Sequence, residues 1–170
     1  METVVSSFAE QVRDHDADLV RTTRARAPDA IDDRLEPPVV GSGLGTVGLS
    51  LDDLETAVKT DPTPEDLYDA ATGLTPAISA VADYGSVVLQ GTVDGEEPMS
   101  LYPETNVVVV AESAITAHMA DALETIAAEI REGNRSHVVA TGPSATADMG
   151  DLVLGAHGPK AVTVVVVSDE

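Results

Sequence analysis

The residues that could carry chemistry are concentrated in residues 142–160, which read GPSATADMGDLVLGAHGPK. This stretch holds two Gly-Pro turns, the hydroxyls of Ser144 and Thr146, the carboxylate of Asp148 and the imidazole of His157. A serine, a histidine and an aspartate are the parts of a hydrolytic triad. Glycines and hydroxyls ahead of a helix can instead hold an anionic ligand. In a third interpretation a hydroxyl only caps that helix. The residue types alone leave these three alternatives open.

The order of elements around this stretch favours the ligand-binding interpretation. The segment SHVVATG (136–142) predicts a buried strand, and we expect a helix to begin at 146–148. Open α/β sheets bind ligands where a loop leaves the carboxyl end of a strand and enters a helix. Gly142 permits close backbone approach, and His157-Gly158 forms a second turn before the last strand. The triad is disfavoured because Ser144 lacks a G-x-S-x-G elbow.

Two other patterns are weaker candidates. Residues 43–48, GLGTVG, spell the glycine fingerprint of dinucleotide-binding proteins, but a second helix is predicted where that fingerprint needs a strand. We therefore interpret them as a loop beside the sheet. No metal site is expected, because no HxH, HxxxH or HExxH spacing relates the four histidines His15, His118, His137 and His157.

The elements that must position these residues alternate in type. Apolar periodicity and capping residues predict helices over 2–27, 51–59, 63–73 and 116–134. Strands are predicted over 86–93, 106–112, 136–142 and 162–167, with a hairpin-type turn at 94–97. Aliphatic runs such as VVVV are typical of strands buried on both faces. The sequence thus predicts an α/β fold with a mostly parallel sheet and flanking helices, in one domain of residues 1–170 with an N-terminal helical segment over 1–35.

Composition narrows the partners and the environment. Thirty Asp and Glu face nine Lys and Arg, giving a formal net charge of −21, which disfavours nucleic acid and anionic membranes as partners. Dispersed carboxylates and scarce lysine indicate adaptation to high salt, where repulsion is screened. With no cysteine, the chain lacks the ligands of an iron–sulfur cluster. The N-terminus has no signal-peptide pattern and no apolar run is long enough to span a membrane, so we expect a halophilic, acidic, cytoplasmic protein.

Three blocks of the sequence resemble a known family. TGPSATADMGDLVLGAHGPKAVTVVVV (141–167) resembles the C-terminal signature of the LUD-domain family of LutC-type lactate-utilisation proteins: a GPS-x-TAD loop, a G-x-HGP segment and an aliphatic strand. The blocks at 82–93 and 101–110 resemble further segments of the family, so residues 75–167 are the best-matching core. The family commonly has a histidine where this chain has Asn106. The signature positions that transfer are Gly142, Pro143, Ser144, Thr146, Ala147, Asp148, His157, Gly158 and Pro159.

The resemblance carries its own expectations about fold and function. It implies a fold like that of CoA transferases, ribose-phosphate isomerases and glucosamine-phosphate deaminases (NagB/RpiA/CoA-transferase-like). It also implies an accessory role in oxidising L-lactate to pyruvate, within an L-lactate dehydrogenase complex whose iron–sulfur clusters lie in partner subunits. The chain itself would then carry no cofactor and would bind a small anionic or nucleotide-like ligand at the 142–148 loop. A homo-oligomer is compatible with this role.

Two alternatives remain open at this point. The chain could be a free-standing CoA-transferase-like or isomerase-like enzyme, for which Glu104 is the candidate carboxylate nucleophile and His157 a candidate acid or base. It could equally be a non-catalytic interaction module in which the GPS-x-TAD signature is architectural.

Overall fold

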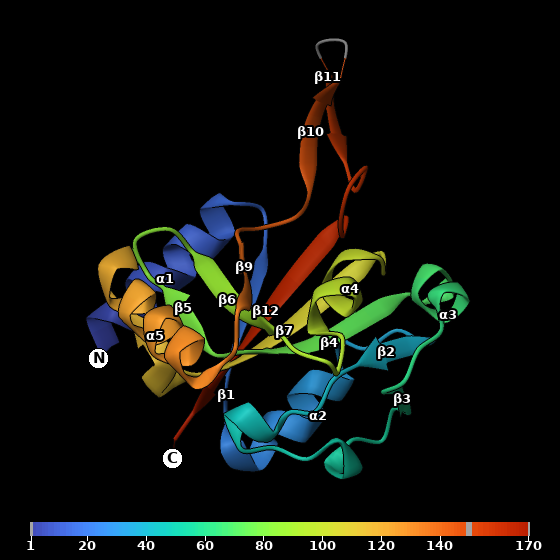
Figure 1. The fold of residues 1–170 in the computed structure, drawn as a ribbon, viewed down its shortest axis with the longest axis horizontal. Coiled ribbons are helices and arrows are strands. Elements are labelled where there is room, and N and C mark those ends of the chain that lie inside the picture. The colour runs from blue at the N-terminus through green and yellow to red at the C-terminus, as the bar shows by residue number, and fades with distance from the viewer. Residues whose placement is uncertain (1, 149–150, 170) are drawn as a thin grey trace.

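Six parallel strands form the centre of the protein, as the computed structural model shows for residues 2–148 and 151–169 (Figure 1). Their order is β1-β12-β7-β4-β2-β3, and each neighbouring pair runs parallel. The predicted α/β class with a mostly parallel sheet is therefore confirmed. The strands are β1 Asp18–Thr23, β2 Val39–Gly41, β3 Val58–Lys59, β4 Thr72–Ala77, β7 Thr105–Ala111 and β12 Ala161–Ser168.

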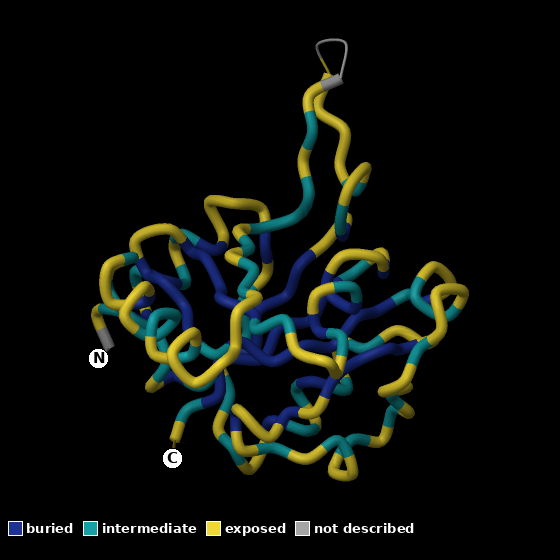
Figure 2. Tube along the Cα trace, in the orientation of Figure 1, coloured by how far each residue is buried: buried dark blue, intermediate teal, exposed yellow. Residues whose placement is uncertain are grey.

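Strands β7 and β12 carry the valine runs that the sequence predicts to be buried. Successive residues of a strand point to opposite faces of its sheet. One set of alternating residues lies in the core on one face, namely Val108, Val110, Val164 and Val166. The other set lies in the core on the opposite face, namely Val107, Val109, Val165 and Val167. Both strands are therefore buried on both faces, and the centre of the sheet is the most buried part of the chain (Figure 2).

Different layers cover the two faces of the large sheet. Helix α1 (Glu2–Asp14) and a four-stranded second sheet, in the order β8-β5-β6-β9, share the core that contains Phe8 and Val12. Helix α2 (Ala27–Asp32) packs on the opposite face through Ala27 and Ile31. The second sheet comprises β5 Ser79–Val81, β6 Ser86–Gly91, β8 Ile115–Thr116 and β9 Ser136–Ala140. None of the helices in the described ranges combines the length and apolar character needed to cross a bilayer.

The N-terminal segment differs from its prediction as a helical region over 1–35. Helix α1 ends at Asp14, Asp16 adopts a left-handed backbone conformation, and residues 18–23 form β1. The helical spacing of Val5, Phe8 and Val12 is the buried face of α1. Residue 19 fits that spacing only by coincidence, because its side chain packs from an edge strand paired with β12.

The helices predicted over 51–59 and 63–73 are shorter than expected. Ser50 does cap a turn, since its Oγ accepts a hydrogen bond from the Asp52 amide, but that turn is the three-residue 3-10 helix η3 (Leu51–Asp53). Helix α3 (Pro64–Asp69) begins at the predicted Thr63 cap, which forms a capping box. Gly73 does not end it and lies instead in β4. A methyl group there would lie 1.9 Å from the Met99 carbonyl oxygen, so glycine lets another segment pack against the strand.

Two further predictions concern the middle of the chain. The prediction of a hairpin-type turn at 94–97 is wrong, because helix α4 (Glu96–Leu101) begins within these residues. Helix α5 (Met119–Glu132) is confirmed and ends at Gly133, whose φ of 107° suits a left-handed C-terminal cap. Its predicted apolar face is not the core of the molecule, however, since Leu123 and Ile130 are about half exposed.

The region of the signature differs most from its prediction. Strand β9 is a partly exposed edge strand of the second sheet rather than a buried central one. No helix begins at 146–148. Strands β10 (Ala145–Asp148) and β11 (Asp151–Leu154) instead pair antiparallel as a hairpin that projects from the body of the protein (Figure 1). Residues 149 and 150, within the signature block of residues 141–167, lie outside the described residues.

Candidate functional site

The two turns of the signature close a small cavity, which we call the signature pocket. Its volume is about 260 Å³, and it lies beside the amino-terminal halves of β7 and β12 and the end of β9. Its apolar walls are Ala17, Val87, Leu101, Val108, Val138, Val162 and Val164. Its polar lining is Ser100, Asn106, Thr141, Ser144 and His157. An apolar cavity with a few convergent polar groups is the usual form of a small-molecule site.

The two turns are fastened to each other. The Ser144 amide donates a hydrogen bond to the Pro159 carbonyl at 2.9 Å, and the Ser144 carbonyl accepts one from the Gly155 amide at 2.9 Å. A methyl group at Gly158 would lie 3.0 Å from the Ser144 Cβ, which is tighter than ordinary van der Waals contact. The G-P-S and H-G-P segments therefore form one unit, although residues 145–156 separate them in the chain.

Gly142 is required by its own geometry. Its φ is +62°, a conformation that favours glycine, and a methyl group there would lie 2.3 Å from the His15 carbonyl oxygen. The turn after β9 thus packs directly on the loop between α1 and β1. This contact places Pro143 and Ser144 over the cavity.

Asn106 contributes the buried polar group of the pocket. It is only 3% exposed, and its Oδ1 accepts a hydrogen bond from the Thr75 hydroxyl at 3.2 Å. That bond fixes the side chain through the acceptor oxygen. The amide Nδ2, which is a donor, is not used in this bond. The Asn106 side chain thus supplies a hydrogen-bond donor at the position where the family commonly has a histidine.

The structure brings together some of the predicted site residues and separates others. Gly142, Pro143, Ser144, His157, Gly158 and Pro159 line the signature pocket. Thr146 and Asp148 lie in strand β10, and Thr146 is not part of the lining. The predicted loop of residues 142–148 is therefore divided between a cavity wall and a projecting hairpin.

Glu104, the candidate nucleophile, contacts Lys160 outside the signature pocket. Its Oε1 lies 2.6 Å from the Lys160 Nζ, and its backbone carbonyl accepts a hydrogen bond from the Lys160 amide at 2.7 Å. Its side chain is 68% exposed, and neither residue lines the signature pocket. Glu104 and Lys160 thus join the segments that lead into β7 and β12.

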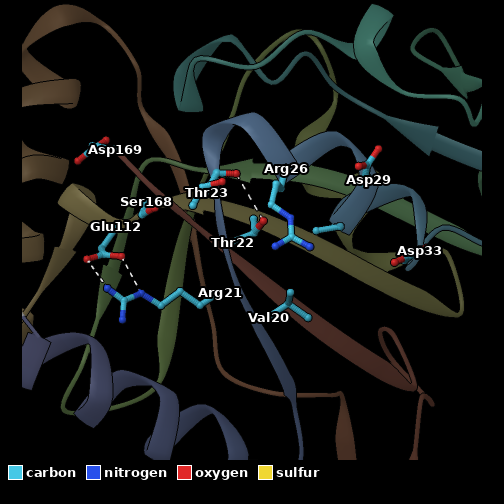
Figure 3. Close-up of a pocket in the computed structure, with 11 residues that line it drawn as sticks. Val20, Arg21, Thr22, Thr23, Arg26, Asp29, Asp33, Glu112, Ser168 and Asp169 are labelled. Atoms are coloured by element: carbon cyan, nitrogen blue, oxygen red, sulfur yellow. Dashed lines mark hydrogen bonds and ion pairs between the residues drawn. The ribbon is translucent and has the colours of Figure 1, made fainter.

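A second cavity was not foreseen from the sequence. It has a volume of about 870 Å³ and lies at the carboxyl ends of β1 and β12 (Figure 3). We call it the arginine pocket; it is lined by Val20, Arg21, Thr22, Thr23, Arg26, Asp29, Ala30, Asp33, Glu112, Ser168 and Asp169. The sequence contained one signal for it: residues 21–26 hold three of only nine basic side chains.

The fold and the signature pocket together define a small α/β protein with a parallel sheet and a cavity closed by a two-turn motif. Residues 5–167 match the model of the LUD domain, and the chain belongs to the LUD-domain family. The resemblance stated from the sequence motifs is confirmed.

Relatives and a solved structure support this assignment. The chain is 29% identical to lactate utilization protein C of Deinococcus radiodurans, over 96% of this chain and 79% of that protein. It is 36% identical to proteins of the same name from Bacillus licheniformis and Bacillus subtilis, over 57% and 59% of this chain. The chain spans less than half of the Bacillus proteins, 42% and 43%. A crystal structure of a DUF162-family protein from Deinococcus radiodurans shares the fold, with a TM-score of 0.77, 23% identity and coverage of 98% and 97% of the two chains.

Proposed function

We propose that this chain is a LutC-type component of lactate utilisation and that its signature pocket binds a small organic acid of the size of L-lactate or pyruvate. The observation that carries the proposal is the cavity itself. The family signature supplies two turns that are fastened to each other and close a space of about 260 Å³. The names of the relatives support the metabolic role.

The chemistry of the lining suits a short hydroxy acid or oxo acid. The valines and Ala17 offer an apolar wall for a methyl group. The Ser144 hydroxyl, the Asn106 amide and the His157 imidazole can donate hydrogen bonds to a carboxylate or to the neighbouring oxygen. A cavity of this size favours a small anion over a nucleotide, since sites for drug-sized ligands begin at about 300 Å³.

The proposal assigns electron transfer to other chains. Oxidation of lactate to pyruvate removes two electrons and two protons, so an acceptor is required. With no cysteine among its 170 residues, this chain has no thiolate to ligate an iron–sulfur cluster. We therefore assign the clusters to partner subunits, and the role of this chain is to bind the acid or to organise the complex.

Binding is tested on matched variants of the signature. L-lactate and pyruvate are titrated into the purified chain by calorimetry, and Ser144→Ala is compared with Thr146→Ala. Both changes remove one signature hydroxyl, but only Ser144 lines the cavity. We expect affinity to fall about tenfold in Ser144→Ala, since a hydrogen bond to a charged group contributes about 1.5 kcal/mol or more. Thr146→Ala should bind as the parent does.

Two results would contradict the binding proposal. If neither acid binds the parent protein, the pocket does not hold such a ligand. If Ser144→Ala lowers only the free energy of unfolding and leaves affinity unchanged, the signature is architectural. The packing of Gly142 and Gly158 gives that alternative a specific structural basis.

The metabolic role is tested genetically. A strain that lacks this chain should fail to grow with L-lactate as its carbon source, and growth should return with the parent gene. Normal growth and intact lactate oxidation in the deletion strain would refute the proposal. A free-standing acyl transferase is less well supported, because the Glu104 carboxylate is paired with Lys160 outside the pocket.

A further inference from the structure

The arginine pocket lies where parallel α/β sheets commonly bind ligands. Thr22 and Thr23 end β1, Ser168 ends β12, and Glu112 directly follows β7. In open sheets of this kind, ligands bind in crevices outside the carboxyl ends of the strands. The signature pocket lies beside the amino-terminal halves of β7 and β12 instead. The arginine pocket is therefore a separate candidate site, and its volume of about 870 Å³ is sufficient for a ligand much larger than lactate.

Of the three arginines in residues 21–26, two form ion pairs with carboxylates of the chain. Arg21 makes a two-pronged ion pair with Glu112, in which Nε and Nη2 donate to the two carboxylate oxygens at 3.0 Å each (Figure 3). Arg24 lies 3.7 Å from the Asp169 carboxylate and donates to the carbonyls of Val47 and Gly48. Both guanidinium groups thus have internal structural roles.

Arg26 differs from these two. Within residues 2–148 and 151–169, no carboxylate forms an ion pair with it and no hydrogen bond of its side chain is found. Its side chain extends into the pocket beside Thr22 (Figure 3). In a chain with thirty acids and nine basic residues, a guanidinium that lies in a cavity without an ion pair to any described carboxylate is unusual. A planar guanidinium is the side chain best suited to hold a carboxylate or a phosphate.

The rest of the lining argues against a simple anion. Asp29 and Asp33 belong to α2 and its C-terminal cap, three and seven positions after Arg26, so they lie on the same side of that helix. With Glu112 and Asp169, the lining holds four carboxylates and two guanidinium groups, although Glu112 pairs with Arg21 and Asp169 lies near Arg24. Carboxylates accept hydrogen bonds from hydroxyl groups, and the hydroxyls of Thr22, Thr23 and Ser168 can add others. A ligand that fits this lining therefore has an acid group at one end, to meet Arg26, and hydrogen-bond donors at the other end, to meet the carboxylates.

We propose that the arginine pocket binds a polyhydroxylated organic acid, with the carboxylate or phosphate on Arg26 and the hydroxyl groups directed to Asp29 and Asp33. This proposal does not depend on what the signature pocket binds. The carboxylated and phosphorylated forms share one recognition chemistry, and the probes of the experiment distinguish them.

The test compares complete ligands with their fragments. D-gluconate and adenosine monophosphate are titrated by calorimetry into the parent chain, alongside acetate and inorganic phosphate, which carry only the acid group. We expect at least one of the two complete ligands to bind about tenfold more tightly than its acid fragment. Gluconate alone would identify a carboxylate ligand, and adenosine monophosphate alone a phosphate ligand.

Two variants assign the binding to this pocket. Arg26→Gln should lower the affinity for the complete ligand at least about tenfold, because a charged hydrogen-bond donor is lost. Arg131→Gln, which changes an arginine of α5 outside either pocket lining, should bind like the parent. Asp29→Asn should reduce the preference for the complete ligand over its acid fragment, because one acceptor for the hydroxyl groups is weakened while repulsion of the acid falls.

The proposal is overturned by any of three results. Neither complete ligand binds; a fragment binds as tightly as its complete ligand; or Arg26→Gln and Arg131→Gln weaken binding equally. The lactate titration of the signature pocket is unaffected by Arg26→Gln if the two sites are independent, so failure here can be distinguished from failure of the proposed function.

Discussion

The signature pocket and the arginine pocket use the two ends of strand β12 in different ways. At the amino end, Val162 and Val164 face a small, mainly apolar cavity closed by the two turns of the signature. At the carboxyl end, Ser168 and Asp169 border a larger cavity lined by charges and hydroxyls. The strand itself is uniform, since Val162 to Val167 are all buried. The difference therefore comes from the segments that enter and leave the strands.

The comparison indicates that the two sites depend on different interactions. Close backbone contacts at Gly142 and Gly158 shape the signature pocket. The Arg21–Glu112 ion pair, with Glu112 only 9% exposed, shapes one wall of the arginine pocket. Backbone contacts are insensitive to salt and pH, whereas ion pairs respond to both.

The largest effect is expected from Gly142→Ala. The substitution combines a left-handed backbone with a steric conflict at the His15 carbonyl, so we expect the free energy of unfolding to fall by roughly 3 kcal/mol in urea titrations. The matched control is Gly133→Ala, where φ is also positive but nothing lies within 4 Å of the added methyl group. It should lose only about 1 kcal/mol from backbone strain. Equal losses would mean that the contact with His15 does not shape the turn.

A smaller loss is expected from Arg21→Ala. The change leaves the buried Glu112 carboxylate without its two-pronged partner, and we expect a loss of about 1 to 2 kcal/mol, since the Arg21 side chain is 44% exposed. Lys160→Ala is the control from the other end of the strand. Its partner Glu104 is exposed, so the loss should stay below about 0.5 kcal/mol. If Lys160→Ala costs as much as Arg21→Ala, burial is not what distinguishes the two ion pairs.

Salt should separate the two sites further. Raising KCl from about 0.1 M to about 2 M screens the repulsion within a chain of net charge −21, so we expect the melting temperature to rise. This is also the test of the predicted adaptation to high salt. Over the same range, affinity for the polyhydroxylated acid at Arg26 should fall more steeply than affinity for lactate in the apolar signature pocket. Parallel losses at both sites would show that the pockets share one electrostatic basis.

The smallest effect concerns a pH-sensitive pair outside both linings. The hydrogen bond to Asp83, followed by the charge of that carboxylate, raises the pKa of His118 above its usual value. Because the folded pKa exceeds the unfolded value of about 6.5, the pair stabilises the protein below that pH, and this contribution is lost as the pH rises through the folded value. In Asp83→Asn, NMR titration should show the His118 pKa moving back toward 6.5. Ligand binding at either pocket should not change, and a change would connect this surface pair to a site.

The parallel sheet could be predicted from the sequence because its strongest signals are local. The valine runs of β7 and β12 need no knowledge of their neighbours, and the Thr63 cap and Gly133 stop are properties of single positions. Strands β1 and β4 were missed for a physical reason. Leu19 continues a helical spacing by chance, and Gly73 and Pro76 are poor strand formers that tertiary contacts override.

The local structure predicted around the candidate site was wrong, whereas the ligand-binding roles of its residues stay predictions. Gly142, Ser144 and His157 meet at one cavity, but the expected helix at 146–148 is the hairpin of β10 and β11. Small residues, a hydroxyl and an aspartate are compatible with either a helix cap or a strand, so propensity cannot decide between them. The arginine pocket needed knowledge of which strand ends lie together, and β1 and β12 come from opposite ends of the sequence.

The position of β12 has a consequence for how the chain reaches this structure. It lies between β1 and β7, so the edge strand formed near the start of the sequence has no partner until residues 161–168 have been synthesised. Until then, β1 lacks its partner β12, and so does the edge of β7 that pairs with β12. Contacts between remote segments form slowly, and such intermediates are prone to aggregate. The high negative charge would keep the nascent chains apart during that interval, so the same carboxylates that oppose compaction would protect the chain before it folds.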